Sequence, residues 1–314
     1  MSDEQSRADA IVQGDRRALA QALTTVERGG QSARALLRCI PAGASGRVVG
    51  ITGAPGAGKS TLTTALAQEF RVRGLTVAIV AVDPSSPITG GSLLGDRIRM
   101  YDLAGDSGVF IRSMANRGRY GGIAAATADA ATLMAAAGYD VILLETVGAG
   151  QSDVAVADVA DTILLVEAPG MGDEVQSIKA GLLEIADVIA VSKSDRADAP
   201  ATFQQLRALV QMQHPSTDAW EVQLCGVSAL QKTGIGPLTD ALLAHQQWLI
   251  QHPYTPRAMH RRKSSLHRAI ETQLFESLTQ TASWVQAQHI LASDRQPDTD
   301  ALAQMVLAAW RTTP

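Results

Sequence analysis

The sequence of 314 residues predicts an α/β protein built on a doubly wound, mostly parallel sheet, with helical extensions at both ends. Between residues 47 and about 228, short β-branched runs alternate with longer segments of helical periodicity, which is typical of a parallel sheet covered on both faces. Helical periodicity alone precedes and follows this region. We therefore expect an N-terminal helical extension over 1–46, a sheet domain over 47–252 and a C-terminal helical arm over 253–314.

Short apolar runs rich in valine and isoleucine mark the predicted strands. They cover residues 48–52, 76–82, 109–112, 141–144, 162–166, 188–191 and 222–227. Apolar residues at helical spacing mark the crossover helices between them. These are Leu62, Leu66 and Phe70, the alanine-rich segment 123–137, and Leu206, Leu209 and Val210. The central region is therefore expected to fold as one α/β unit.

Both ends of the chain show helical patterns without strands. Two short amphipathic helices are expected before the sheet, on the apolar residues Leu19, Leu23, Val26, Leu36, Leu37 and Ile40. After the sheet we expect a helix over 238–250, one long amphipathic helix over 266–285 and a final helix over 302–310.

The apolar stripe of the long helix leads to a quaternary prediction. The stripe consists of Leu266, Ile270, Leu274, Leu278 and Val285. Together with Met305, Val306 and Trp310 it exceeds what one outer layer of helices readily covers, so we expect a homodimer through the C-terminal helices. The alternative is that these helices fold back on the sheet domain of their own chain.

Composition and charge exclude several classes of protein. A net charge of -4 and an isoelectric point near 5.9 give no overall attraction to nucleic acid or anionic membrane. The basic cluster over 257–268 has no interleaved aromatic residues and is interpreted as a solvated or partner-facing surface. The two cysteines form no paired motif. With no apolar segment of about 20 residues and an acidic N-terminus, we expect a cytoplasmic protein without membrane or nucleic-acid partners.

A glycine-rich motif follows the first predicted strand. Its sequence is Gly53-Ala54-Pro55-Gly56-Ala57-Gly58-Lys59-Ser60, followed by Thr61. It matches the pattern G-x-x-x-x-G-K-[ST] at the point where a helix begins. The glycines let backbone N–H groups turn toward phosphates, Lys59 neutralises phosphate charge, and the Ser60 hydroxyl can ligate magnesium. The motif therefore predicts a site for a nucleoside triphosphate.

Carboxylates at the ends of two other predicted strands are candidates for holding the metal. Glu145 follows the strand over 141–144 and begins an E-x-x-G string, in which the amide of Gly148 can follow the γ-phosphate. Asp83 follows the strand over 76–82 and points to the same crevice. We expect Glu145 and Asp83 to bind magnesium or its water ligands. The loop over 89–100, with glycines and both signs of charge, is interpreted as a first switch segment.

The string Ser192-Lys193-Ser194-Asp195 follows another predicted strand and is similar to the N-K-x-D motif for guanine. In that motif the lysine stacks along the base, and the aspartate accepts from N1 and N2 of guanine, which adenine cannot donate together. Serine at position 192 removes a contact near the base edge, though its hydroxyl can replace part of it. Further on, Ser228-Ala229-Leu230 matches a segment whose backbone caps guanine O6. These residues predict binding of GTP and GDP.

Longer strings around these residues closely resemble the MeaB/ArgK-type GTPases, which are G-protein chaperones of adenosylcobalamin-dependent acyl-CoA mutases. The strings are DPSS at 83–86, GGSLLGDR at 90–97, ETVGAGQS at 145–152 and PGMGDEVQSIKAG at 169–181. The resemblance covers roughly residues 34–254. It implies a P-loop NTPase fold of the SIMIBI-like type, magnesium-dependent hydrolysis of GTP to GDP and phosphate, and an acyl-CoA mutase partner, for example methylmalonyl-CoA mutase.

The resemblance also implies roles for individual residues. It assigns phosphate binding, magnesium binding and hydrolysis to Lys59, Asp83, Asp96 and Glu145. It implies that the segment 168–179 moves when the mutase docks, and that the C-terminal helices form a dimerisation arm. Ser192 and Ser194 depart from the family's N-K-A-D string, which bears on nucleotide selectivity. No glutamine follows Gly148 directly, so Gln151 is a candidate for orienting the attacking water, with a structural role as the alternative.

Two other functions are compatible with parts of this pattern. A metal-insertion GTPase for nickel or cobalt centres has a similar fold, but it would want a C-x-C-C motif, paired cysteines or a histidine tract, which this chain lacks. A kinase or transport ATPase, a label that ArgK-type relatives have carried, would show no guanine preference. The leading hypothesis is a GTPase that gates the loading and protection of adenosylcobalamin on a mutase.

Overall fold

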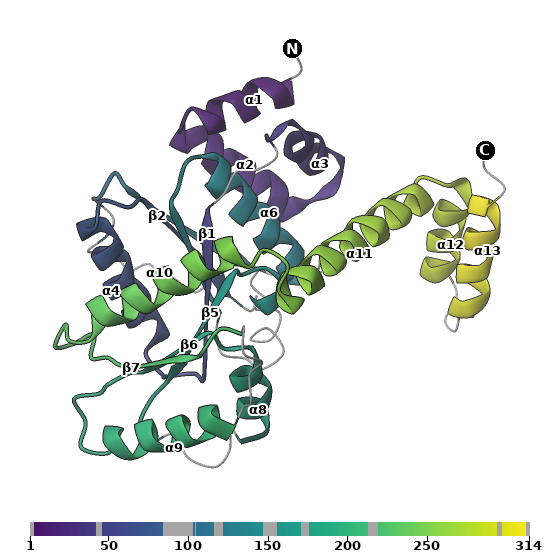
Figure 1. The fold of residues 1–314 in the computed structure, drawn as a ribbon. Coiled ribbons are helices and arrows are strands. Elements are labelled where there is room, and N and C mark those ends of the chain that lie inside the picture. The colour runs from purple at the N-terminus through teal and green to yellow at the C-terminus, as the bar shows by residue number, and fades with distance from the viewer. Residues whose placement is uncertain are drawn as a thin grey trace. The chain divides into compact units, whose positions relative to one another are not determined.

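The computed structural model describes residues 3–41, 46–83, 103, 105–115, 122–146, 156–170, 176–212, 219–293 and 297–311. The chain divides into two compact units, Met1–Arg261 and Arg262–Pro314. The first contains a seven-stranded sheet with helices on both faces, and the second is built from helices (Figure 1). The predicted α/β fold with helical extensions is confirmed.

The sheet is parallel throughout. Its strands are β1 (Arg47–Thr52), β2 (Val77–Asp83), β3 (Val109–Ala115), β4 (Val141–Glu145), β5 (Thr162–Glu167), β6 (Val188–Val191) and β7 (Gln223–Gly226). They lie in the order β3-β2-β4-β1-β5-β6-β7, and every neighbouring pair runs in the same direction. All the predicted strands are present. Because the strands point one way, their carboxyl ends meet at one edge, where ligands of open α/β sheets bind.

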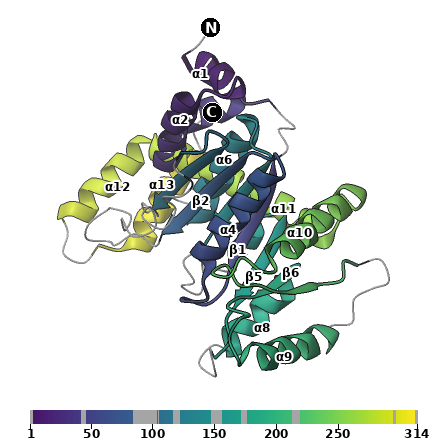
Figure 2. The same ribbon diagram turned by 90° about the vertical axis from the view of Figure 1, so that its left-hand side faces the viewer.

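Helices cover both faces of the sheet (Figure 2). One face carries α1 (Asp3–Val12), α2 (Arg16–Arg28), α3 (Gly30–Cys39) and α6 (Gly122–Ala136), and the other carries α4 (Lys59–Val72) and α10 (Ile235–Gln251). Successive strand residues alternate between the two cores, since Val80 and Ile142 belong to the first and Ile79 and Leu143 to the second. The unbroken apolar runs of the sequence are therefore the result of burial on both sides.

The end of the sheet formed by β5, β6 and β7 has a third, smaller core. There α8 (Gln176–Ile185) and α9 (Ala199–Met212) pack on Leu165, Ile189 and Val191, and both helices lie beside β6 and β7 in Figure 1. These strand residues are almost fully buried. α8 thus connects β5 to β6 and α9 connects β6 to β7, and each returns the chain to the amino end of the sheet.

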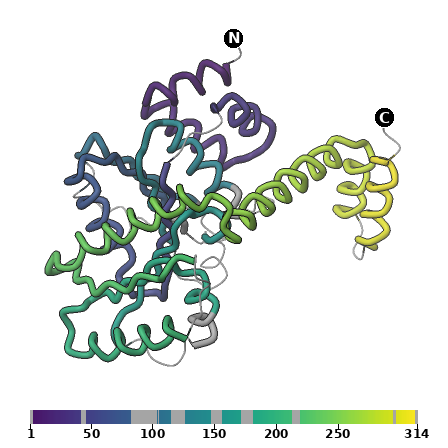
Figure 3. Tube along the Cα trace, in the orientation of Figure 1, coloured from purple at the N-terminus to yellow at the C-terminus, as the bar shows by residue number. Residues whose placement is uncertain are grey.

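The N-terminal extension contains a helix that the sequence pattern does not predict. α2 and α3 match the two expected helices, whereas α1 buries only Ala8 and Ile11 and so lacks a visible apolar stripe. Asp15 caps α2 by accepting from two backbone N–H groups of its first turn. Arg112 of β3 pairs with the buried Glu27 of α2 at 2.7 Å. The extension therefore packs on the sheet unit, as the purple part of the trace in Figure 3 shows.

The last helices of the chain are α11 (Pro256–Thr279), α12 (Ala282–Ser293) and α13 (Thr299–Arg311). The prediction of one continuous helix over 266–285 is wrong, because α11 ends at Thr279. The Thr281 hydroxyl accepts from the N–H of Trp284 at 3.2 Å and caps a new helix instead. Phe275 and Trp284 meet edge to face across the break, with ring centroids 5.3 Å apart. None of the described helices is both long and apolar enough to cross a membrane.

A buried polar cluster lies at the amino ends of β5 and β6, opposite the carboxyl edge. Asp187 pairs with Arg257 and with Nε2 of His245, whose side chain is 2% exposed, at 3.4 Å. Arg261 pairs with Asp161 at 2.8 Å. A cavity of about 880 Å³ adjoins these residues. Part of the basic cluster interpreted as a solvated or partner-facing surface therefore pairs with carboxylates of its own chain.

His245 predicts a pH-dependent stability. Burial lowers the pKa of His245 from 6.5 to about 4, and its Nδ1 lies 2.9 Å from the Thr162 hydroxyl. Between pH 6.5 and pH 4, His245 is protonated in the unfolded chain and neutral in the folded chain. The folded state therefore loses stability as the pH falls toward 4. We expect the free energy of unfolding to drop by roughly 2 kcal/mol between pH 7 and 5 from this group. Urea unfolding of His245→Gln should show a shallower pH slope, and exposed His267→Gln should keep the wild-type slope; equal slopes would contradict the assignment.

Candidate nucleotide site

The glycine-rich loop lies between the end of β1 and the start of α4, at the carboxyl edge of the sheet. Gly53, Gly56 and Gly58 have φ angles of +138°, +76° and +91°, which strain any other residue. A Cβ atom on Gly53 would lie 2.1 Å from the carbonyl oxygen of Val166, so the loop passes β5 too closely for a side chain. The loop over 53–58 therefore needs its glycines for the sharp turn that predicts phosphate binding.

Lys59 is the first residue of α4 and is only 6% exposed. Its Nζ donates to the carbonyl oxygens of Gly53 at 2.8 Å and Ala54 at 3.0 Å. The lysine side chain thus folds back over its own loop at the N-terminus of α4. Positive charge and helix N-terminus are concentrated at one place, which favours an anion.

Ser60 and Glu145 meet at this loop. β4 lies next to β1, with Ile51 opposite Glu145, so the carboxylate ends beside the first turn of α4. The Ser60 hydroxyl donates to Oε1 of Glu145, which is 8% exposed. Hydroxyl and carboxylate oxygens are the donors that Mg²⁺ prefers. The pair therefore fits a magnesium site.

Asp83, the second predicted metal ligand, lies at the same edge of the sheet as Glu145. Asp83 is the last residue of β2, which lies next to β4 with Ala81 opposite Glu145. Three predicted residues lie outside the described part of the chain, namely Asp96, Gly148 and Gln151. The structure therefore brings Lys59, Ser60 and Glu145 together and places Asp83 at the same edge of the sheet.

The loop after β6 is tied to the glycine-rich loop by two side chains. The Ser192 hydroxyl, in a residue 5% exposed, donates to the carbonyl oxygen of Ala57 at 2.6 Å. Nζ of Lys193 donates to the carbonyl oxygen of Gly56 at 3.0 Å, and Lys193 has a left-handed φ of +50°. The loop that predicts base recognition is thus fastened to the loop that predicts phosphate binding.

A cavity of about 320 Å³ lies where these loops and the turn after β7 converge. The predicted residues that line it are Gly58, Thr61, Ser192, Lys193, Asp195, Ser228, Ala229 and Leu230. A hydrogen bond from the Ser228 hydroxyl lowers the pKa of the Asp195 carboxyl below its usual value. Asp195 is therefore ionised at neutral pH and can accept two hydrogen bonds from a base. The cavity has the size and the acceptor for a purine with two adjacent donors.

Three residues that line this cavity are not predicted from the sequence. Leu62, Arg196 and Val227 also border the cavity. Arg196 directly follows the base-recognition string and pairs with Asp198 at 2.9 Å, so its position in the sequence could have suggested it. Leu62 and Val227 look like ordinary core residues in the sequence, and both are in fact nearly fully buried.

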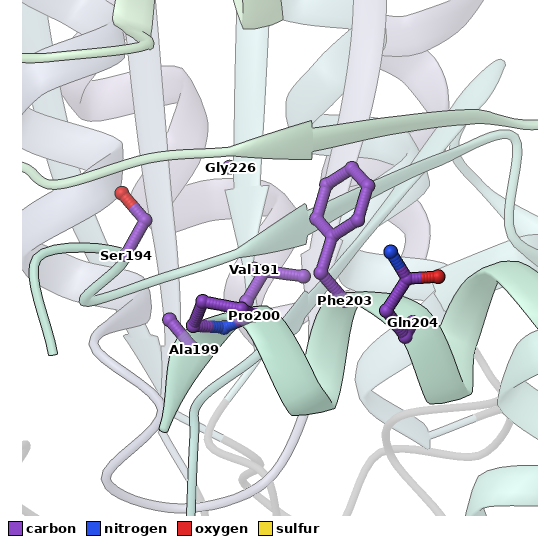
Figure 4. Close-up of a pocket in the computed structure, with 7 residues that line it drawn as sticks. All are labelled: Val191, Ser194, Ala199, Pro200, Phe203, Gln204 and Gly226. Carbon is purple, nitrogen blue, oxygen red and sulfur yellow. The ribbon is translucent and has the colours of Figure 1, made fainter. Parts of the chain in front are cut away.

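Ser194 belongs to a different cavity. About 290 Å³ lie between the loop and α9, lined by Ser194 and by mostly apolar residues such as Val191 and Phe203 (Figure 4). Ser194 is not among the residues that line the base cavity. The departure from the family string at this position therefore lies away from the predicted base, whereas the departure at Ser192 lies beside it.

Comparisons with known proteins also indicate a nucleotide site, because the matching family and relatives are GTPases. The family described as "Methylmalonyl Co-A mutase-associated GTPase MeaB" matches residues 19–284. A relative from Pyrococcus abyssi is 44% identical over 267 residues, which are 84% of this chain and 82% of the relative. GTPase ArgK of Escherichia coli K12 is 38% identical over 254 residues, or 77% of each chain. The solved structure of an LAO/AO transport system kinase has a TM-score of 0.70 and 26% identity, and covers 97% of each chain.

The family match spans both the phosphate loop and the base-recognition loop, and it extends into the C-terminal helices. The seven-stranded parallel sheet places those two loops at one edge, in contact with each other. The chain therefore belongs to the MeaB family of P-loop GTPases, which bind guanine nucleotide and hydrolyse GTP to GDP and phosphate.

Proposed function

We propose that this GTPase is a chaperone for an adenosylcobalamin-dependent acyl-CoA mutase and that its nucleotide state gates loading and protection of the cofactor. The observation that supports this most is the family match over 19–284, which includes the site and the string at 169–181 that resembles the family's extra switch. The contact of Ser60 with Glu145 adds a structural reason, because the E-x-x-G string begins at the candidate metal site. A change at the γ-phosphate can thus act on the segment that follows Glu145.

Each site residue has a role in this proposal. The N–H groups of the loop over 53–58 and the ammonium of Lys59 bind the phosphates. Ser60, Asp83, Asp96 and Glu145 hold Mg²⁺ or its waters, and the ion, when bound, neutralises charge on the β- and γ-phosphate oxygens. Gln151 orients the attacking water. Asp195 accepts from guanine N1 and N2, Lys193 stacks along the base, and the turn over 228–230 receives O6.

The mutase hypothesis is tested with the full chain and an adenosylcobalamin-dependent acyl-CoA mutase, for example methylmalonyl-CoA mutase. We expect the mutase to stimulate GTP hydrolysis, and we expect GTP to promote transfer of adenosylcobalamin to the apo-mutase, followed by its absorbance spectrum. The control is the same mixture with GDP. If neither the hydrolysis rate nor the cofactor transfer changes when the mutase is added, the chaperone role is refuted, while the GTPase assignment is unaffected.

We also propose that the C-terminal helices form a homodimer. α11 has no buried residue, and Leu266, Ile270 and Leu274 are 61%, 46% and 40% exposed at a spacing of four residues. A stripe of this kind on one helix face is typical of an interface.

The dimer predicts a mass near twice 33.0 kDa by light scattering. Ile270→Asp combined with Leu274→Asp should reduce the mass to that of a monomer, because two charges would be buried in the interface. Gln273→Asp, on an exposed residue of the same helix, should leave the dimer intact. A wild-type monomer, or a dimer that survives the double substitution, would contradict the proposal.

A further inference from the structure

We infer that Ser192 is a positioning residue for the phosphate loop and that it leaves N7 of guanine unread, so that guanine is selected through its N1, N2 and O6 groups alone. The inference rests on the proposed nucleotide site. It explains how a serine can stand at residue 192, the position that is asparagine in the N-K-x-D motif.

The hydroxyl of Ser192 has one proton, and the structure shows where it goes. It is donated to the carbonyl oxygen of Ala57 at 2.6 Å, across 135 positions of sequence. The backbone of Ser192 is fixed as well, since its N–H donates to the carbonyl oxygen of Glu167 at 2.7 Å. With its side chain almost fully buried, the hydroxyl is held in this direction.

Away from the sugar-side N3, guanine presents two acceptors, N7 and O6, and two donor groups, N1–H and the N2 amino group. Asp195 is suited to the two donors, and the backbone of the turn over 228–230 is suited to O6. N7 needs a donor, and Ser192 lines the same cavity beside Gly58 at the phosphate-loop end. Because a hydroxyl can donate only once, the bond to Ala57 leaves Ser192 with no proton for N7.

Asparagine at position 192 would differ from serine in the number of hydrogen-bond donors that its side chain carries. Its amide has two N–H donors, so one can serve the Ala57 carbonyl and the other can reach N7. Ser192 lines the cavity of about 320 Å³, so a longer side chain at this position would extend toward the base. The departure at position 192 therefore keeps the bond between the two loops and removes one contact to the base.

The test compares the binding of GDP and 7-deaza-GDP, which has a carbon in place of N7, by isothermal titration calorimetry. For the wild-type protein we expect the two dissociation constants to agree within about twofold. Ser192→Asn should bind GDP about five- to tenfold more tightly than 7-deaza-GDP, the value of one added hydrogen bond. Ser192→Ala should weaken the binding of GDP and of 7-deaza-GDP by the same factor. Ser192→Thr, which keeps the hydroxyl, should bind both ligands with the wild-type affinities.

Inosine diphosphate, which lacks the N2 amino group, is the control and should bind more weakly than GDP to every variant. A wild-type protein that binds 7-deaza-GDP more than fivefold more weakly than GDP would overturn the inference. A ratio near one in Ser192→Asn, or a ratio that changes in Ser192→Ala, would also overturn it. Failure of the wild-type protein to bind GDP at all would instead refute the nucleotide site on which the inference rests.

Discussion

Lys59→Ala is expected to reduce the rate of GTP hydrolysis by about 100- to 1000-fold and to weaken binding of GTP. The ammonium of Lys59 is the positive charge that the structure holds inside the phosphate loop, bonded to the carbonyl oxygens of Gly53 and Ala54. When phosphates enter, these bonds are exchanged for bonds to the β- and γ-oxygens, where negative charge grows during hydrolysis. The measurement is phosphate release at saturating GTP and Mg²⁺.

The fold has to survive the change for this result to be informative. Without the ammonium, the Gly53 and Ala54 carbonyls lose a donor, so the thermal unfolding midpoint is measured beside activity. Lys263→Ala removes a lysine from an exposed position of α11 and should alter neither quantity. If a folded Lys59→Ala protein hydrolysed GTP at the wild-type rate, the assignment of the phosphate loop would be wrong.

Asp195→Asn is expected to weaken GDP binding by about 100-fold and to shift preference toward xanthosine diphosphate. The ionised carboxylate accepts from two guanine donors, and hydrogen bonds to a charged group are each worth about 1.5–3 kcal/mol. An amide offers one acceptor and one donor instead, which matches a base that carries a carbonyl at position 2. Competition binding with GDP, xanthosine diphosphate and ADP measures the ranking.

Asp198→Asn is the matched control, because Asp198 lies three residues further along the same loop and pairs with Arg196 at 2.9 Å. It should leave the ranking of nucleotides unchanged. The lowered pKa of Asp195 adds a prediction about pH. Because the pKa of Asp195 lies below its usual value of 3.8, the carboxyl is ionised throughout the range from pH 5 to 8, and guanine preference should be constant over that range. An unaltered ranking in Asp195→Asn would exclude this residue from base recognition.

Local sequence was enough for the strands and for the residue types of the site. Unbroken apolar runs predict the strands, because each residue of a strand covered on both faces is buried whichever way it points. The motif at 53–60 is legible because its glycines meet conformational demands of the loop itself, as the positive φ angles of Gly53, Gly56 and Gly58 show. These conformational requirements involve only a few neighbouring residues, so they can be recognised in the sequence.

Local patterns fail where two local signals compete, where an apolar stripe is too short to recognise, and where a side chain pairs with a distant segment. The sequence predicts one helix over 266–285, but Thr281 caps a new helix there through a side-chain bond that competes with helix continuation. α1 is absent from the prediction because Ala8 and Ile11 alone face the core. The basic cluster after residue 256 reads as surface, yet Arg257 and Arg261 pair with Asp187 and Asp161 of loops that lie far earlier in the chain.

The α/β class, the phosphate loop, the base-recognition string and the family resemblance can all be predicted from short contiguous patterns of residues. The strand order cannot, and it is this order that sets β4 beside β1 and so brings Glu145 to Ser60 across 85 positions. The tertiary structure also decided that the Ser192 hydroxyl turns to Ala57. A hydrogen bond between distant segments depends on where the sheet places both partners. The acceptor of a serine hydroxyl therefore cannot be predicted from the residues next to it in the sequence.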